Sequence, residues 1–214
     1  MALLSAVDNL KQAHELAYFK ARENLRCWDP VDMAASSGSS FVGSLSSFRL
    51  KYVAKEYKID FPSGDVTYAN KFGTVAISEK IVLLHYLIRA SGLEPKNSWI
   101  SFREVPAGGM IYYVPFTKRV TNYLVEVFGE KPYLLLEAGK MLGGCVMNGS
   151  GFGVKINVLP RLPIVFIVWA GDDEFSPRGT VLFDATASCY LSPEDLVVAA
   201  GFAVKQLAKI SELL

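Results

Sequence analysis

The first part of the chain shows the hydrophobic period of a helix. Apolar residues recur at three- and four-residue steps over residues 3–27, with charged residues between them, which predicts an amphipathic helix. Asp29-Pro30 ends this helix. The small polar residues that follow, from Ala34 to Ser40 and beyond, have little side chain to bury, and they predict a mobile loop.

The next part alternates with the period of a strand. In residues 48–53 and 57–61, aromatic and aliphatic side chains alternate with charged ones, as expected of two strands that each have one solvated face. A helix is then predicted to open at Ser78, whose side chain can cap exposed amides. It continues through the apolar run Ile81–Ala90 and ends near Gly92.

The middle of the chain predicts short elements, and the last third contains its most apolar segment. The middle elements are a strand (98–105), a turn (106–109), a short extended piece (110–114) and two helices (117–128 and 132–141). Residues 154–158 alternate, which predicts a strand with one polar face, whereas Ile164–Trp169 has no polar interruption. A strand without alternation is covered on both faces, so we place Ile164–Trp169 at the centre of the sheet.

The order of the elements favours an α+β fold. Helices and strands follow one another without the regular βαβ alternation of a doubly wound sheet. We therefore expect a mixed or antiparallel sheet with helices packed on it, in a single globular domain over residues 1–214. The last helix, capped by Ser192 and running to about Leu213, packs on one side of the central strand.

Composition limits the classes of function. With 214 residues, 51% of them hydrophobic, the chain needs no metal or disulfide to be stable. Its formal charge is +1 and no basic run exceeds Lys118-Arg119, which argues against nucleic acid and anionic membranes as partners. Cys27, Cys145 and Cys189 fit neither a disulfide framework nor a metal spacing. Without an export signal or an apolar run of the ~20 residues that span a bilayer, we expect a soluble cytoplasmic protein.

A cluster of carboxylates follows the buried strand. Asp172, Asp173 and Glu174 come shortly after it, and Asp184 ends the next apolar segment. Carboxylates held close together bind divalent cations such as Mg²⁺ or Ca²⁺, and Asp172 and Glu174 can share one side while Asp173 points away. We therefore take Asp172, Glu174 and Asp184 as candidate metal ligands. The alternative for the first three acids is a hydrophilic turn.

A candidate ligand pocket adds residues from other parts of the sequence. With Asp172 and Glu174, its predicted residues are His85, Glu104, Arg161 and Trp169. His85 lies in an apolar run, where it either serves as a proton carrier or metal ligand or is hydrogen-bonded in the core. Glu104, at a strand end, either reaches the pocket or is solvated at the surface. Arg161 either binds a carboxylate or phosphate, or pairs with an acid such as Asp184.

No catalytic motif identifies a reaction. The segment Gly149–Gly153 contains GxGxG, but it precedes a strand and no Gly-Lys-Ser/Thr follows, so the context of a phosphate-binding loop is missing. His14 and His85 are too few for a histidine-rich zinc site. The sequence identifies no cofactor.

Five segments in a fixed order carry a resemblance to a known family; they are 83–87, 101–104, 159–163, 169–175 and 182–184. Over about residues 15–212, they resemble a family of uncharacterised prokaryotic proteins that are found largely in anaerobes and described only as a domain of unknown function. The resemblance implies a cytoplasmic single domain. It also implies an N-terminal iron–sulfur segment in some relatives, which we do not expect in this chain, and it assigns no activity to any residue.

Three hypotheses about function follow. The first is a protein that binds a small molecule or a cofactor, which the resemblance places as an accessory factor in anaerobic redox or one-carbon metabolism. The second is a metal-assisted hydrolase, which requires Asp172, Glu174 and Asp184 to converge on one metal, with Glu104 or His85 as the base. The third is a structural or assembly partner that has an exposed apolar patch in place of a pocket. The expected partner is thus a small molecule or a protein, and the oligomeric state is left open.

Overall fold

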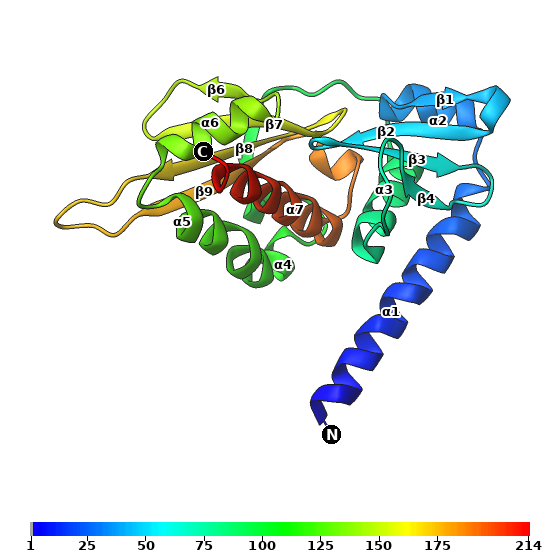
Figure 1. Ribbon diagram of the computed structural model, residues 1–214, viewed down its shortest axis with the longest axis horizontal. Coiled ribbons are helices and arrows are strands. Elements are labelled where there is room, and N and C mark those ends of the chain that lie inside the picture. The colour runs from blue at the N-terminus through cyan, green and yellow to red at the C-terminus, as the bar shows by residue number, and fades with distance from the viewer. Residues whose placement is uncertain (1) are drawn as a thin grey trace. The chain divides into compact units, whose positions relative to one another are not determined.

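The computed structural model describes residues 2–214, except for the side chains of residues 2–7 and 10. The chain divides into two compact units, Met1–Gly92 (unit 1) and Leu93–Leu214 (unit 2). Helices and antiparallel sheets occur in both units (Figure 1), so the predicted α+β class is confirmed. The single domain over residues 1–214 stays a prediction. Among the described helices, none combines the length and the apolarity needed to cross a bilayer.

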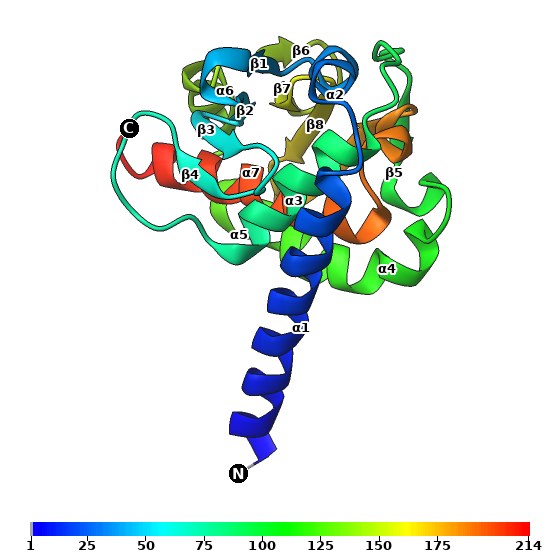
Figure 2. The ribbon, with the colours of Figure 1, turned by 90° about the vertical axis from the view of Figure 1, so that its right-hand side faces the viewer.

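Unit 1 combines helices with an antiparallel sheet of strand order β1-β2-β3-β4. Its elements are α1 (Ala2–Leu25), α2 (Pro30–Ser37), β1 (Ser40–Val42), β2 (Ser47–Tyr52), β3 (Lys55–Asp60), β4 (Val66–Tyr68) and α3 (Ile77–Arg89). The predicted N-terminal helix and the predicted pair of strands are confirmed. α1 extends past the other elements of its unit in both views (Figures 1 and 2), and it contacts α3, with Ala21 and Leu25 buried. The predicted apolar face of this helix also includes Leu3, Val7 and Leu10, whose side chains are outside the part that the structure describes.

The loop predicted from Ala34 onward is wrong at its start, because residues up to Ser37 belong to a second helix, which begins at Pro30. One Asp29 carboxylate oxygen accepts the backbone N–H groups of Val31 and Asp32, at 2.8 and 3.1 Å, and thereby caps α2. Two of the small residues predicted to be mobile, Ala34 and Ser37, are instead buried. Gly38 then ends the helix in the left-handed conformation, with φ of 71°.

A buried polar contact ties the sheet of unit 1 to α3. The Tyr57 hydroxyl donates to a carboxylate oxygen of Glu79, and the Lys55 ammonium lies 3.7 Å from the same oxygen. Burial raises the pKa of Tyr57, and so does its hydrogen bond to Glu79, so the phenol stays protonated. α3 begins after Ala76, without a side-chain cap, so the predicted cap at Ser78 is wrong. Glu79, in the first turn of α3, still interacts favourably with the helix dipole.

Unit 2 is built on an antiparallel sheet of strand order β5-β9-β8-β7-β6. Its elements are β5 (Trp99–Ser101), α4 (Gly109–Phe116), α5 (Asn122–Phe128), α6 (Tyr133–Met141), β6 (Cys145–Met147), β7 (Phe152–Leu159), β8 (Leu162–Trp169), β9 (Arg178–Asp184) and α7 (Pro193–Ser211). β8 lies at the centre of the sheet and is buried on both faces from Leu162 to Phe166, as predicted. α5, α6 and α7 pack on the sheet (Figure 1), and the Ser192 hydroxyl accepts the Asp195 N–H at 3.2 Å, which confirms the predicted cap.

The predicted extended piece over 110–114 is wrong, because these residues belong to α4. Their aromatic and β-branched side chains suit a strand by propensity, but tertiary packing decides the outcome. The Phe116 ring stacks on Phe102, with ring centres 4.1 Å apart. At the start of the helix, a Cβ on Gly109 would lie 2.2 Å from the Phe102 carbonyl oxygen, so only glycine fits. The helix continues through a π-helical segment, Thr117–Thr121, into α5, so the predicted helix over 117–128 is confirmed.

The close approach of α6 to β7 at Gly139 gives a test of this packing. A Cβ at Gly139 would lie 2.4 Å from Cγ2 of Val154, a branched side chain that cannot easily turn away. We expect Gly139→Ala to lower the free energy of unfolding by about 1–3 kcal/mol, despite the better helix propensity of alanine. Urea denaturation measures the change. Gly149→Ala is the control, since no atom lies within 4 Å of its added Cβ. Equal stability of both variants would contradict the packing argument.

Candidate functional site

One end of the sheet in unit 2 carries two loops side by side. The β8–β9 ladder ends at the pair Trp169–Arg178, so the loop 170–177 projects beyond it. Phe152 pairs with Val168 on the neighbouring strand, which brings the β6–β7 loop, residues 148–151, to the same end (Figure 1). This end of the sheet holds the acidic segment that follows the central strand.

A polar hollow of about 490 Å³ lies at this end, between the loop 170–177 and the C-terminal end of α5. Gly129 and Glu130 form its second wall. Glycine is needed at position 129, because a Cβ there would lie 2.8 Å from Cβ of Pro177. The hollow is open to solvent, and Glu130, Asp172, Asp173 and Glu174 are all exposed.

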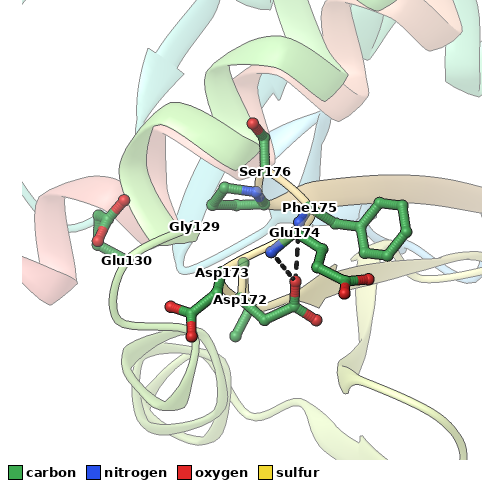
Figure 3. A pocket seen from close by; sticks show the side chains of 10 residues that line it. Gly129, Glu130, Asp172, Asp173, Glu174, Phe175 and Ser176 are labelled. Carbon is green, nitrogen blue, oxygen red and sulfur yellow. Dashed lines mark hydrogen bonds between the residues drawn. The ribbon is translucent and has the colours of Figure 1, made fainter.

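The acidic loop has a defined turn. One oxygen of the Asp172 carboxylate accepts the N–H groups of Glu174 and Phe175, at 2.9 and 2.7 Å, and the Asp172 N–H donates to the Phe175 carbonyl at 2.9 Å. This is an Asx turn, in which the side chain replaces a backbone acceptor. In Figure 3 the Asp173 carboxylate lies on the side of Glu130, whereas Glu174 and the Phe175 ring lie on the other side.

The four carboxylates of the hollow carry uncompensated charge. Within the described part of the chain, no basic side chain forms an ion pair with Glu130, Asp172, Asp173 or Glu174. Negative groups gathered around a concave surface attract positive ligands. The arrangement therefore favours a cation, and it offers charge-assisted hydrogen-bond acceptors to an ammonium or guanidinium group.

The predicted metal ligands are not brought together. β9 is seven residues long, which spans about 20 Å, and it places Asp184 at the far end of the β8–β9 hairpin from Asp172 and Glu174. Among the described residues, no group of three or more His, Cys, Asp or Glu side chains is placed to hold a metal ion. Cys27 and Cys145 are exposed free cysteines, and Cys189 is half-buried.

Asp184 is a buried carboxylate with backbone partners. One of its oxygens accepts the N–H groups of Lys96 and Thr186 and the Thr186 hydroxyl, at 3.1, 3.0 and 2.7 Å. Burial raises the pKa of Asp184, but these hydrogen bonds outweigh it, so the net pKa lies below its usual value. Asp184 thus ties the segment that enters β5 to the end of β9.

Arg161 and Glu104 each have a local partner. The Arg161 guanidinium lies 2.7 Å from a carboxylate oxygen of Glu94, so the acid that it pairs with is Glu94 and not the predicted Asp184. Glu104 accepts hydrogen bonds from the Ser101 hydroxyl and N–H, at 2.6 and 2.8 Å, and caps a short 3-10 helix, Phe102–Glu104. These bonds, the hydroxyl first, hold the pKa of Glu104 below its usual value.

Trp169 lies at the end of the unit 2 sheet that carries the hollow, whereas His85 belongs to unit 1. The Arg178 guanidinium lies 5.2 Å from the centre of the Trp169 ring, within range of a cation–π contact. The indole also packs against Gly151, where a Cβ would lie 2.7 Å from its Nε1. His85 is half-buried in α3.

Glu130 is the site residue that the sequence alone did not indicate. It lies 40 positions before Ala170, and only the packing of Gly129 against Pro177 brings it to the loop. The one local signal is Gly129, which directly follows the helix predicted over 117–128.

A family model described as "Domain of unknown function (DUF3786)" matches residues 29–206. The chain belongs to the DUF3786 family. The DUF3786 match spans both units and all predicted site residues, and it confirms the predicted resemblance to an uncharacterised family. A prokaryotic, anaerobic origin and the iron–sulfur segment of some relatives stay predictions. No curated protein and no solved structure matches the chain.

The buried carboxylate of Asp184 gives a pH-dependent test of its structural role. We expect Asp184→Asn to lower the free energy of unfolding at neutral pH by about 1–3 kcal/mol, because the charge-assisted hydrogen bonds are lost. The folded-state pKa of Asp184 lies below the ordinary value, so its stabilisation is complete above that value and is lost as pH falls through the folded pKa. Urea titrations should therefore show a difference between wild type and variant that shrinks below about pH 4. A difference that stays constant with pH would contradict this role.

Proposed function

We propose that this DUF3786 protein binds a small organic cation, an amine or guanidinium compound, in the hollow between Glu130 and the loop 170–177. The observation that carries the proposal is the set of four carboxylates without a described basic partner around one hollow. Its volume of about 490 Å³ lies in the range of small-molecule sites. The exposed Phe175 ring adds an aromatic surface of the kind that attracts organic cations.

The other two hypotheses have less support. A metal-assisted hydrolase requires Asp172, Glu174 and Asp184 in one coordination sphere, and the β8–β9 hairpin holds Asp184 away from the other two. An assembly role is the second candidate, and it is favoured by one observation: Met110, Ile111 and Val114 on α4 are 68, 79 and 74% exposed. The metabolic setting that we propose, an accessory role in anaerobic redox or one-carbon metabolism, rests on the family resemblance alone.

Calorimetric titration with spermidine at low ionic strength tests the proposed site. We expect the variant Glu130→Gln, Asp173→Asn, Glu174→Gln to raise the dissociation constant at least about tenfold, equivalent to ~1.4 kcal/mol. Asp172 is left unchanged because it holds the turn. The control variant neutralises three exposed acids outside the hollow, at the same change in net charge; these are Asp8, Glu15 and Glu212.

The outcomes separate the hypotheses. An equal loss of spermidine affinity in both variants would mean attraction by net charge without a site, and would contradict the proposal. Parallel titrations with Mg²⁺, Mn²⁺, Ca²⁺ and Zn²⁺ test the hydrolase hypothesis. Suppose that the wild type binds a metal ion but not spermidine, and that only the variant with neutralised Glu130, Asp173 and Glu174 loses the metal. The ligand of the hollow would then be a metal ion and not an organic cation. Added salt should weaken spermidine binding, because the acids are exposed.

A further inference from the structure

The β6–β7 loop carries a reactive dipeptide at the same end of the sheet as the hollow. The chain has seven asparagines, and Asn148 is the one that glycine follows. Asn148 and Gly149 are both exposed. The last pair of the β6–β7 ladder is Met147–Gly153, so neither residue is held by strand pairing.

We propose that Asn148 is a site of spontaneous deamidation. The backbone nitrogen of Gly149 attacks Cγ of the Asn148 side chain and loses its proton to water or hydroxide, which forms a new C–N bond and closes a five-membered ring. The side-chain nitrogen leaves as ammonia, and a cyclic imide remains. Water then adds to either imide carbonyl, and ring opening gives aspartate or isoaspartate. No oxidant, metal or enzyme takes part, and base accelerates the first step.

The local structure favours this reaction at Asn148. The attacking nitrogen must approach Cγ of the preceding residue, and glycine lacks the side chain that would obstruct the approach. No heavy atom lies within 4 Å of the position of a Cβ on Gly149, so the loop has room to change conformation. By contrast, Asn122 lies within helix α5 and Asn157 within strand β7, so neither is in a loop. The Asn70 amide nitrogen is engaged by the Glu56 carboxylate at 2.7 Å.

The product changes the charge next to the hollow. Replacing one amide by a carboxylate changes the formal net charge from +1 to 0, since one negative charge is added. Gly151 of the same loop packs against Trp169, the last residue of β8 before the acidic loop. The new carboxylate therefore joins the end of the sheet that already carries Asp172, Asp173 and Glu174. The isoaspartate product also lengthens the loop backbone by one methylene group.

Ageing of the full-length protein at mildly alkaline pH and physiological temperature tests the inference. Isoelectric focusing should show one new acidic species, and peptide mapping should locate it at Asn148 as a mixture of aspartate and isoaspartate. Protein isoaspartyl methyltransferase provides an independent readout, because it labels isoaspartate and not aspartate. Gly149→Ala should lose the acidic species, since the added methyl group obstructs the attack.

The same experiment contains the results that would overturn the inference. One is an acidic species that persists in Gly149→Ala or that maps to another asparagine. Another is the absence of the species in the folded wild type during a period in which the free peptide 145–153 converts fully. The Gly149→Ala variant is expected to fold normally, because its Cβ meets no atom within 4 Å, and its unfolding curve checks this.

Discussion

The pairing of β8 with β9 is the constraint on which the arrangement of unit 2 depends. β8 is apolar on both faces, so its own pattern does not fix which neighbour residue it faces. β9 supplies the missing information, because Val181 and Phe183 are buried on one face of an alternating strand. A slip of one residue would turn both side chains to the other face and expose them. The observed register, with Ile164 opposite Phe183, therefore follows from burial in β9.

This register places carboxylates at both ends of the hairpin, but in different environments. At one end, Asp184 is fully buried; its Oδ1 atom accepts hydrogen bonds from two backbone amides and a hydroxyl, whereas its Oδ2 atom is buried without a hydrogen-bond partner among the described residues. At the other end, Asp172 has its turn contacts, while Asp173 and Glu174 face water. Carboxylates at the two ends thus differ in role because burial differs: the buried one holds the fold, and the exposed ones are available to a ligand.

Much of the fold could be predicted from local pattern, and the two helices that the pattern did not predict have different causes. The central strand was recognisable because it lacks alternation, and α7 because Ser192 precedes it. α2 was missed because small residues were interpreted as having nothing to bury, although small size is what allows them to pack. α4 was missed because its start depends on the close approach of Gly109 to Phe102, which the local sequence does not contain.

The site was predictable only in part, because tertiary pairing and packing decide which of its residues come together. The position of Asp172 and Glu174 beyond a buried strand follows from sequence order. The separation of Asp184 from them depends on antiparallel pairing, which brings the end of β9 back to the start of β8. The apolar sequence of β8 does not reveal whether the neighbouring strand runs parallel or antiparallel to it. Glu130 comes from a helix end that only tertiary packing places beside the loop.

The hollow gathers four carboxylates around one concave surface. Like charges that gather around one concave surface repel each other, and in the described part of the chain no basic side chain forms an ion pair with these acids. Solvent screens this repulsion but does not remove it at low ionic strength. A ligand that binds only the folded state adds its binding free energy to stability. A cation in the hollow would therefore stabilise the protein both by its own contacts and by relieving repulsion.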